Sequence, residues 1–205
     1  MENLIIINGS PRGERSNSNE YSKIFKTYWN EPVESYIILD KRHSDVCRKI
    51  SDYSNILFVF PLYADCLPAI LLEFLKELEK HDIKNKPTVH AIINCGFMEP
   101  EQNYVAVDIL RLFCQNNKFK FGTVLCIGSG EAILKTPFSN LVKRKIRKTA
   151  TAIKKNKNLI LKVTMPIPKK LYVKASASYW LNLGAKNGID YEKMSRMEIE
   201  DKLNP

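Results

Sequence analysis

The sequence lacks closely spaced cysteine pairs. No C-x-x-C motif occurs among its 205 residues, and the five cysteines stand singly, at Cys47, Cys66, Cys95, Cys114 and Cys126. This spacing argues against a zinc site, a clustered iron–sulfur centre and a small disulfide-stabilised fold. The odd number of cysteines and the lack of a basic, apolar leader at the N-terminus favour a reducing compartment. We therefore expect a cytoplasmic protein with no metal site.

Long hydrophobic runs are absent as well. The most apolar stretch, residues 55–75, is interrupted by Pro61, Asp65 and Pro68. A membrane-spanning helix needs about 20 apolar residues without such breaks, so we expect no transmembrane segment. With 44% hydrophobic and 26% charged residues, the composition is typical of a folded globular protein rather than a disordered chain.

Acidic residues are missing from one long segment. Residues 132–189 contain 14 of the 32 Lys and Arg residues and none of the 22 Asp and Glu residues, so this segment holds the whole excess of positive charge. Within it, residues 140–155 have the spacing of an amphipathic helix, with basic residues opposite an apolar face. A solvated helix face is the simplest interpretation. The alternatives are attraction of anionic nucleotides, an acidic partner or a membrane surface. No motif for specific nucleic-acid recognition is present.

What the sequence does contain is an alternation of strand-like and helix-like segments. Short apolar runs, several of them rich in β-branched or aromatic residues, predict strands at residues 4–8, 33–39, 56–60, 88–94, 123–127 and 159–163. Apolar residues at helical spacing predict helices over residues 67–78, 106–114 and 142–153. The alternation predicts a doubly wound α/β domain over residues 1–164 with right-handed crossovers.

The pattern changes near Met165. The prolines Pro166 and Pro168 break any regular element, and a helical stretch with several aromatic residues follows, ending near Asn187 and Gly188. We expect residues 165–205 to be a helical appendage of the same domain. Its aromatic residues would pack on the core or on a second subunit.

The strongest local signal is the polar loop after the first predicted strand. It reads NGSPRGERSNSN over residues 8–19 and leads into a helix. Serine hydroxyls, free backbone N–H groups at a helix N-terminus and arginine side chains are the groups that bind a phosphate. The alternative is that residues 16–19 only cap the helix. Neither the P-loop nor the dinucleotide-binding glycine pattern is present.

This loop resembles the phosphate loop of the flavodoxin-like NAD(P)H-dependent FMN reductases and quinone reductases. The resemblance implies a flavodoxin-like fold with a five-stranded parallel sheet in the order 2-1-3-4-5 and a helical tail. It also implies that the FMN phosphate is bound at the positions that match the family loop, which are Ser10, Arg12, Ser16, Asn17 and Ser18.

Two further segments resemble the family. Pro61, Leu62 and Tyr63 match a loop that lies against the isoalloxazine ring, where Tyr63 would stack on or flank the ring; the alternative for Tyr63 is an aromatic residue that closes the core. Asn94, Gly96 and Phe97 match a loop at the pyrimidine end of the flavin, where Gly96 would permit close backbone approach. Tyr63 is also the candidate catalytic residue, since it would contact the ring or the substrate.

The family implies an FMN-dependent oxidoreductase that passes hydride from NADH or NADPH to a small acceptor such as a quinone or a flavin, and that forms a homodimer. Two alternatives remain. One is an FMN-carrying electron-transfer protein, against which the net charge of +10 counts because such flavodoxins are usually acidic. The other is a protein that keeps the fold and uses its basic helix to bind a partner.

Overall fold

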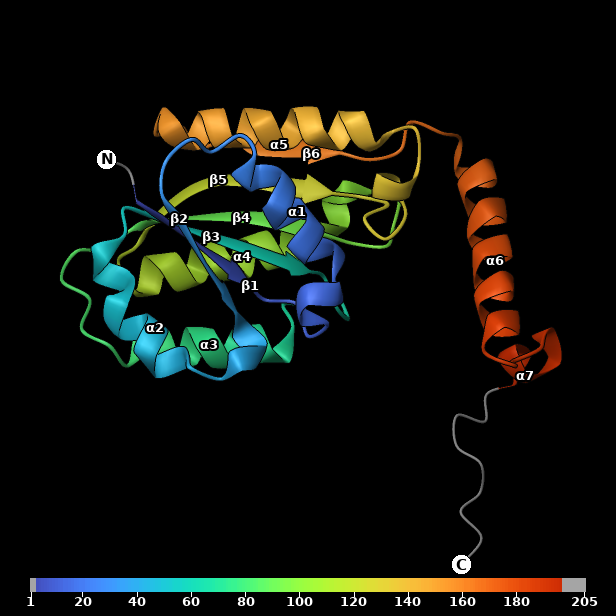
Figure 1. Cartoon of the computed structure of the whole chain (residues 1–205), viewed down its shortest axis with the longest axis horizontal. Coiled ribbons are helices and arrows are strands. Elements are labelled where there is room, and N and C mark those ends of the chain that lie inside the picture. Colours follow the sequence, from blue (N-terminus) through green and yellow to red (C-terminus); the bar gives the residue numbers. More distant parts are fainter. Residues whose placement is uncertain (1–2, 197–205) are drawn as a thin grey trace, which may run out of the picture. The chain divides into compact units, whose positions relative to one another are not determined.

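Six parallel strands form one sheet in the computed structural model, which describes residues 3–196 (Figure 1). The sheet order is β2-β1-β3-β4-β5-β6. The strands are β1 (Leu4–Asn8), β2 (Val33–Ile37), β3 (Asn55–Pro61), β4 (Thr88–Asn94), β5 (Lys120–Ile127) and β6 (Ile160–Val163). Strands β1, β3, β4 and most of β5 are buried on both faces, which explains their continuous apolar runs.

The expected number of five strands is wrong, although the predicted α/β flavodoxin-like order of the first five strands is confirmed. The sixth strand, β6, pairs in parallel with β5, with Leu161 opposite Leu125 and Val163 opposite Ile127. Its buried residues Leu161 and Val163 alternate with exposed Ile160 and Lys162, as in a half-covered edge strand. The helix α5 (Ser139–Lys154) carries the chain back to the same edge, so that a strand pairs there rather than a loop.

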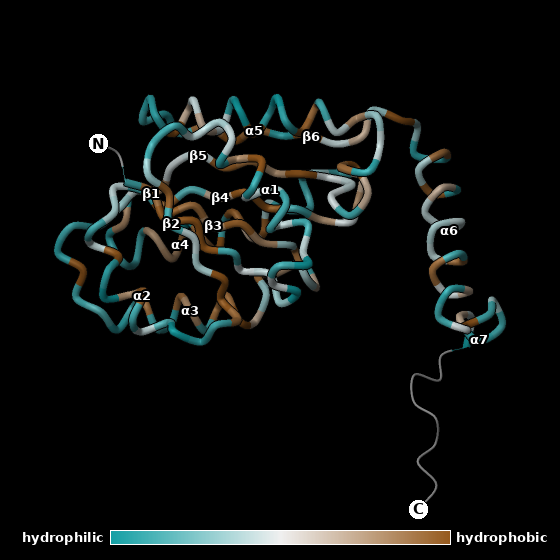
Figure 2. Tube along the Cα trace, in the orientation of Figure 1, coloured by the Kyte–Doolittle hydropathy of each residue, from teal (hydrophilic) through white to brown (hydrophobic). Residues whose placement is uncertain are grey.

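Helices cover both faces of the sheet (Figure 1). One face carries α1 (Asn17–Lys26) and α5, and the other carries α2 (His43–Lys49), α3 (Ala69–Glu79) and α4 (Tyr104–Asn116). Short 3-10 helices occupy Gly13–Arg15, Ile38–Asp40, Ile50–Asp52, Pro100–Asn103 and Ile133–Lys135. Hydropathy follows this layering, because the strands are predominantly hydrophobic and hydrophilic residues mark the outer side of α5 (Figure 2).

A buried histidine bridges the centre of the sheet. His90 lies on β4, where the register with β5 shifts between Val89 and Ala91. Its Nδ1 accepts a hydrogen bond from the backbone N–H of Thr123 at 2.9 Å, and its Nε2 lies 3.0 Å from Asn55 Oδ1. Because the amide oxygen of Asn55 can only accept, His90 is neutral with its proton on Nε2. Burial lowers the pKa of His90 to about 4.

The chain divides into two compact units, and the second begins at Pro166. In the second unit, α6 (Lys169–Lys186) is followed by α7 (Tyr191–Ser195). These helices pack at Gly184, where an added Cβ would lie within 3.0 Å of the Ile189 carbonyl oxygen and meet Met194. Large apolar side chains of α6, among them Leu171, Tyr179 and Trp180, are exposed. Among the described residues, no helix is long and apolar enough to cross a membrane.

Candidate functional site

Four loops follow β1, β3, β4 and β5 at the carboxyl edge of the sheet. The sheet order reverses between β1 and β3, and in open α/β sheets ligands bind beyond the strand ends at such a point. The residues predicted for the site lie on the first three of these loops and on the strand or helix ends beside them: Ser10, Arg12, Ser16, Asn17, Ser18, Pro61, Leu62, Tyr63, Asn94, Gly96 and Phe97. The structure therefore gathers them at one edge of the first unit.

The first loop is held in shape by its own polar side chains. Asn8 Oδ1 accepts from the backbone N–H of Ser10 at 3.0 Å, and Ser16 Oγ accepts from the backbone N–H of Asn19 at 3.1 Å. Ser16 is thus the N-cap of α1, as the alternative interpretation of the sequence expected. Gly13 has a φ of +52°, which favours glycine. Ser10 and Ser16 are buried supports of the loop, whereas Arg12 is exposed.

The first turn of α1 ties this loop to its neighbours. Ser18 is buried and donates to Asn94 Oδ1 at 3.1 Å. Asn17 Nδ2 donates to the carbonyl oxygen of Gly130 at 3.0 Å and to the Glu131 carboxylate at 3.2 Å. Ser18 and Asn94 therefore hold the β1 and β4 ends together, and Asn17 reaches the loop after β5.

Glu131 is a residue of the candidate site that no sequence motif indicates. Its carboxylate lies 3.5 Å from Arg12 Nη1 and also accepts the hydrogen bond from Asn17. An acidic group of the chain itself thus faces two of the residues predicted to bind phosphate. Only its position in the sequence marks Glu131 as a site residue. It follows the Gly128-Ser129-Gly130 turn after β5 and is the last acidic residue before the basic segment.

The loop after β3 presents Tyr63 to solvent. The backbone N–H of Leu62 donates to the Asn94 carbonyl oxygen at 2.8 Å, and Tyr63 pairs with Cys66 in an isolated antiparallel bridge. Between them, Ala64 and Asp65 have φ values of 46° and 54°, a left-handed conformation that costs roughly 1–2 kcal/mol for each non-glycine residue. Pro61 and Leu62 are buried, whereas Tyr63 is 42% exposed, so Tyr63 does not close the core.

The loop after β4 is open at Gly96 and Phe97. Phe97 is 53% exposed, and a Cβ added to Gly96 would meet no described atom within 4 Å. Behind them, Cys95 is buried and accepts from Asn103 Nδ2 at 3.4 Å. Burial raises the pKa of the Cys95 thiol to about 11, so Cys95 stays a thiol at neutral pH.

The loop after β5 locks these elements together. The backbone N–H of Gly130 donates to the Cys95 carbonyl oxygen at 2.7 Å, and Tyr21 Oη donates to the Gly130 carbonyl oxygen at 2.8 Å. A Cβ on Gly130 would stand 2.8 Å from the Cβ of Asn94, which is closer than packing allows. The outward-facing side chains of these loops are therefore Arg12, Tyr63 and Phe97, with open space beside Gly96, whereas the amide of Asn17 already donates to Gly130 and Glu131.

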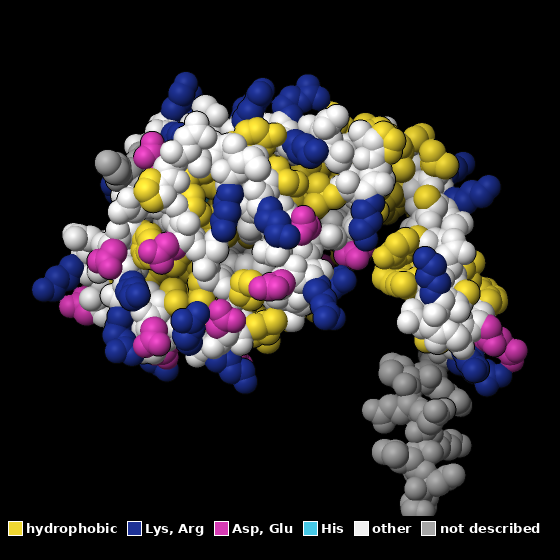
Figure 3. All heavy atoms as spheres, in the orientation of Figure 1, with side chains coloured by type: hydrophobic (Ala, Val, Ile, Leu, Met, Phe, Trp, Pro, Cys, Tyr) yellow, Lys and Arg dark blue, Asp and Glu magenta, His cyan; other side chains and the backbone are white. Residues whose placement is uncertain are grey.

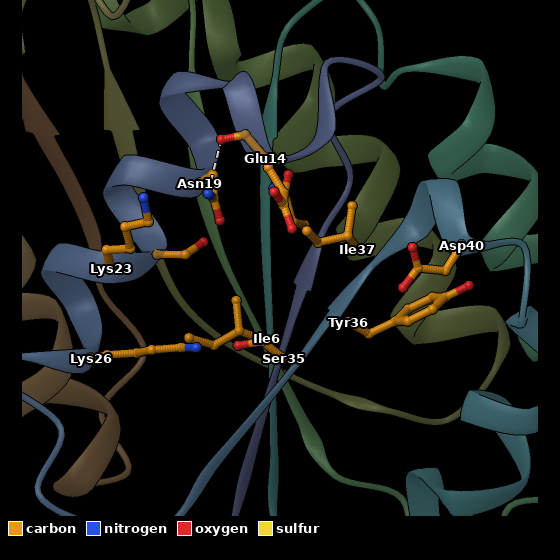
Figure 4. Close-up of a pocket in the computed structure, with 11 residues that line it drawn as sticks. Ile6, Glu14, Asn19, Lys23, Lys26, Ser35, Tyr36, Ile37 and Asp40 are labelled. Atoms are coloured by element: carbon orange, nitrogen blue, oxygen red, sulfur yellow. Dashed lines mark hydrogen bonds between the residues drawn. The ribbon is translucent and has the colours of Figure 1, made fainter.

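A separate cavity lies between α1 and β2 (Figure 4). It has a volume of about 490 Å³, and its lining includes the cations Lys23 and Lys26 and the carboxylates Glu14 and Asp40. None of the predicted site residues lines it, and its charges are balanced. We therefore place the candidate site at the loops and not in this cavity. Within residues 3–196, no group of three or more His, Cys, Asp or Glu side chains is arranged to hold a metal ion.

Comparison with known proteins assigns the fold. No family model matches the sequence, and no curated protein matches it. The structure is similar to an FMN-dependent NADH-azoreductase from Bacillus anthracis in complex with FMN (TM-score 0.59, 11% identity, 74% of this chain and 99% of that chain). It is also similar to an NADPH-quinone reductase from P. pentosaceus (TM-score 0.56, 15% identity, 73% and 98%). A Fusobacterium nucleatum flavodoxin bound to flavin mononucleotide matches as well (TM-score 0.58, 14% identity, 76% and 98%).

The chain has a flavodoxin-like fold. The resemblance in the phosphate loop is thus confirmed at the level of the fold, which these neighbours share despite their low identity.

Proposed function

We propose that this protein is an FMN-dependent oxidoreductase that takes electrons from NADH or NADPH. The observation that carries the proposal is the juxtaposition, at the switch point of a flavodoxin-like sheet, of a polar loop before α1 with the exposed Tyr63, Gly96 and Phe97. The neighbours in fold support it, since their names include an FMN-dependent NADH-azoreductase and an NADPH-quinone reductase.

The chemistry of the residues fits FMN at both ends. Arg12 and the backbone N–H groups of Asn17 and Ser18 at the start of α1 are donors suited to a phosphate dianion, and the Asn17 amide would join them by exchanging its hydrogen bond to Glu131 for one to the phosphate. The open space in front of Gly96 admits the flat edge of a ring, which a side chain at that position would obstruct. When bound, FMN would supply the redox chemistry.

The residues would then have distinct roles. Arg12 and Asn17 would bind the phosphate, while Ser10, Ser16, Ser18 and Asn94 would keep the loops in place through the hydrogen bonds described above. The backbone of Leu62 and the ring of Tyr63 would orient the isoalloxazine, with Pro61 setting the direction of the turn. Phe97 would exclude water from one side. We assign Tyr63 a contact with the ring or the substrate.

The acceptor would be a small molecule such as a quinone or a free flavin, a class that the name of the similar NADPH-quinone reductase supports. We also propose a homodimer, whose second subunit would cover exposed apolar side chains such as Trp180. An electron-carrying role without a substrate of its own is the second candidate, because a flavodoxin is among the similar structures.

Anaerobic mixing separates the two candidates. The protein is loaded with FMN and treated with NADPH or NADH while the visible absorbance of oxidised flavin is followed. An oxidoreductase loses this absorbance within seconds and regains it when a quinone is added. A carrier keeps its absorbance with both nucleotides but loses it with dithionite, and that result would reject the enzyme.

A further inference from the structure

A basic cleft runs between α5 and the edge strand β6. It has a volume of about 670 Å³ and is lined by residues from one side of α5 and from the end of β6. Five of the lining side chains are cationic: Arg144, Lys145, Arg147, Lys148 and Lys162. Figure 3 shows Lys and Arg side chains along the α5 edge of the first unit, whereas acidic and basic side chains are mixed at the opposite edge.

Most of this charge is not neutralised by the chain. Lys162 pairs with Glu101 at 2.9 Å, but the described residues offer no carboxylate within ion-pair distance of Arg144, Lys145, Arg147 or Lys148. The cleft lining itself contains no acidic residue.

The other helices of the first unit are built differently. Each of α1, α2, α3 and α4 carries an ion pair between residues three apart, such as Glu20 with Lys23 and Asp108 with Arg111. The helix α5 has six basic residues and no acidic one. Like charges four residues apart, as in Arg144 and Lys148, destabilise a helix by a few tenths of a kcal/mol. An ordinary solvated face would carry mixed charge at no such cost.

The concave shape and the lining narrow the class of ligand. Besides the cations, the lining includes the apolar side chains of Leu141 and Val163 and the hydroxyl groups of Thr151 and Thr164. A cleft of this volume can hold a small molecule, whereas nucleic acids and membranes are bound by more extended basic surfaces. Several unpaired cations at one place favour a ligand with several negative charges, because phosphate groups accept charge-assisted hydrogen bonds from Arg and Lys.

The cleft also reaches the candidate functional site. Thr164, which lines its end, donates a hydrogen bond to the Met98 carbonyl oxygen at 2.5 Å and lies 3.0 Å from Ser129 Oγ. Met98 and Ser129 belong to the loops after β4 and β5. A ligand in the cleft would therefore lie beside the loops that carry Gly96 and Phe97.

We propose that the α5–β6 cleft binds a small anion that carries two or more phosphate groups, such as a nucleoside diphosphate or the phosphates of NADPH. Arg144, Lys145, Arg147 and Lys148 contact the phosphates, and Leu141 and Val163 contact the uncharged part. The proposal does not depend on flavin binding, since the cleft shares no residue with the first loop.

Calorimetric titration with pyrophosphate tests it directly on the full chain without flavin. The test variant is Arg144→Gln with Lys148→Gln, and the matched control is Lys143→Gln with Lys155→Gln, which removes the same charge from α5 and its C-terminal cap, outside the cleft lining. We expect the test variant to bind pyrophosphate at least about tenfold more weakly and the control to differ from wild type by less than about threefold.

Equal weakening in both variants would show general attraction and overturn the proposal. Loss of binding in Arg12→Ala, with no effect of the cleft variant, would place the anion at the first loop and overturn it too. In a third outcome, the cleft variant binds pyrophosphate as wild type does and loses only the binding of RNA or of anionic phosphatidylserine vesicles. That result would overturn the proposal of a small ligand in favour of a macromolecule or a membrane.

The source of the phosphates is read from two further titrations. Tighter binding of NADPH than of NADH, lost in the cleft variant, would identify the reductant as the ligand. If ADP binds in the cleft and the protein binds NADPH and NADH equally tightly, the ligand is a nucleotide other than the reductant. Neither result depends on whether the protein reduces FMN, so failure of the cleft and failure of the proposed enzyme are distinguishable.

Discussion

The first loop and the α5–β6 cleft both present cations, but the two regions differ in how far carboxylates of the chain neutralise these cations. Arg12 lies 3.5 Å from the carboxylate of Glu131, and Asn17 donates to the same carboxylate. Arg144, Arg147 and Lys148 face no acidic partner among the described residues. A ligand anion at the first loop must therefore compete with Glu131, whereas in the cleft it meets uncompensated charge. The difference teaches that net charge alone does not locate an anion site.

The largest expected effect is on the free energy of unfolding, and it concerns the part of the sheet around His90 that supports both regions. His90 fills the register shift between β4 and β5, and β6 of the cleft pairs with β5. Its folded pKa of about 4 lies below the unfolded value of about 6.5, so the unfolded chain binds more protons between these values. The contribution of neutral His90 to the free energy of unfolding is therefore complete above pH 6.5. It is lost as the pH drops to 4, which lowers the free energy of unfolding by about 3 kcal/mol. Urea unfolding at several pH values measures this loss.

A variant isolates the contribution of this histidine. In His90→Asn the amide oxygen takes the position of Nδ1 and can still accept from Thr123, but the group does not titrate. The stability difference between wild type and variant should shrink by about 3 kcal/mol from pH 7 to pH 4. A difference that stays constant with pH would contradict the assignment of the buried neutral imidazole.

The next prediction concerns two glycines in the loops of the candidate site, outside the α5–β6 cleft. Gly130→Ala places a methyl group 2.8 Å from Asn94 Cβ and 3.1 Å from the Cys95 carbonyl oxygen, so we expect a loss of roughly 1–3 kcal/mol in the free energy of unfolding. Gly96→Ala is the matched control, since its methyl group meets no described atom within 4 Å. It should leave stability within about 0.5 kcal/mol but weaken FMN binding.

Equal stability of the two glycine variants would show that the loop after β5 is not the lock described above. If Gly96→Ala binds FMN as tightly as wild type, the flavin ring does not lie in front of the loop after β4. Pyrophosphate binding in the cleft should be the same in Gly96→Ala and wild type, because the cleft lining does not include this loop.

The elements of the fold were readable from the sequence where burial is complete. The apolar runs of β1, β3 and β4 and the stripe of α3 need no long-range information, because their periodicity follows from the packing of each element. The sequence pattern predicts a strand at β6, yet the family resemblance implies a five-stranded sheet. Pairing with β5 depends on how α5 returns the chain, which local pattern does not encode.

The candidate site was harder to predict because its contacts join distant residues. The bond from Asn17 to Glu131 spans 114 positions, and that from Ser18 to Asn94 spans 76. The left-handed turn at Ala64 and Asp65 lacks the glycine that usually signals it. The sequence therefore predicts the loops of the candidate site, while the tertiary structure shows which of their side chains face outward and which hold the loops together.

The smallest expected effect tests the competition by Glu131. Glu131→Gln removes the negative charge beside Arg12, so FMN should bind roughly three- to tenfold more tightly, consistent with about 1 kcal/mol for a partly exposed charge pair. Riboflavin carries no phosphate, and its affinity should not change. Fluorescence titration measures both affinities, and an equal gain for the two ligands would contradict an electrostatic origin.

The same titration on wild type and on Arg12→Ala with Asn17→Ala tests the central claim most directly, namely that the first loop binds the phosphate of FMN. Each lost charge-assisted hydrogen bond should cost about 1.5–3 kcal/mol, so FMN affinity should fall by about a hundredfold or more in the double variant while riboflavin affinity stays the same. Equal losses for FMN and riboflavin, or no binding of FMN to the wild-type protein, would contradict the account.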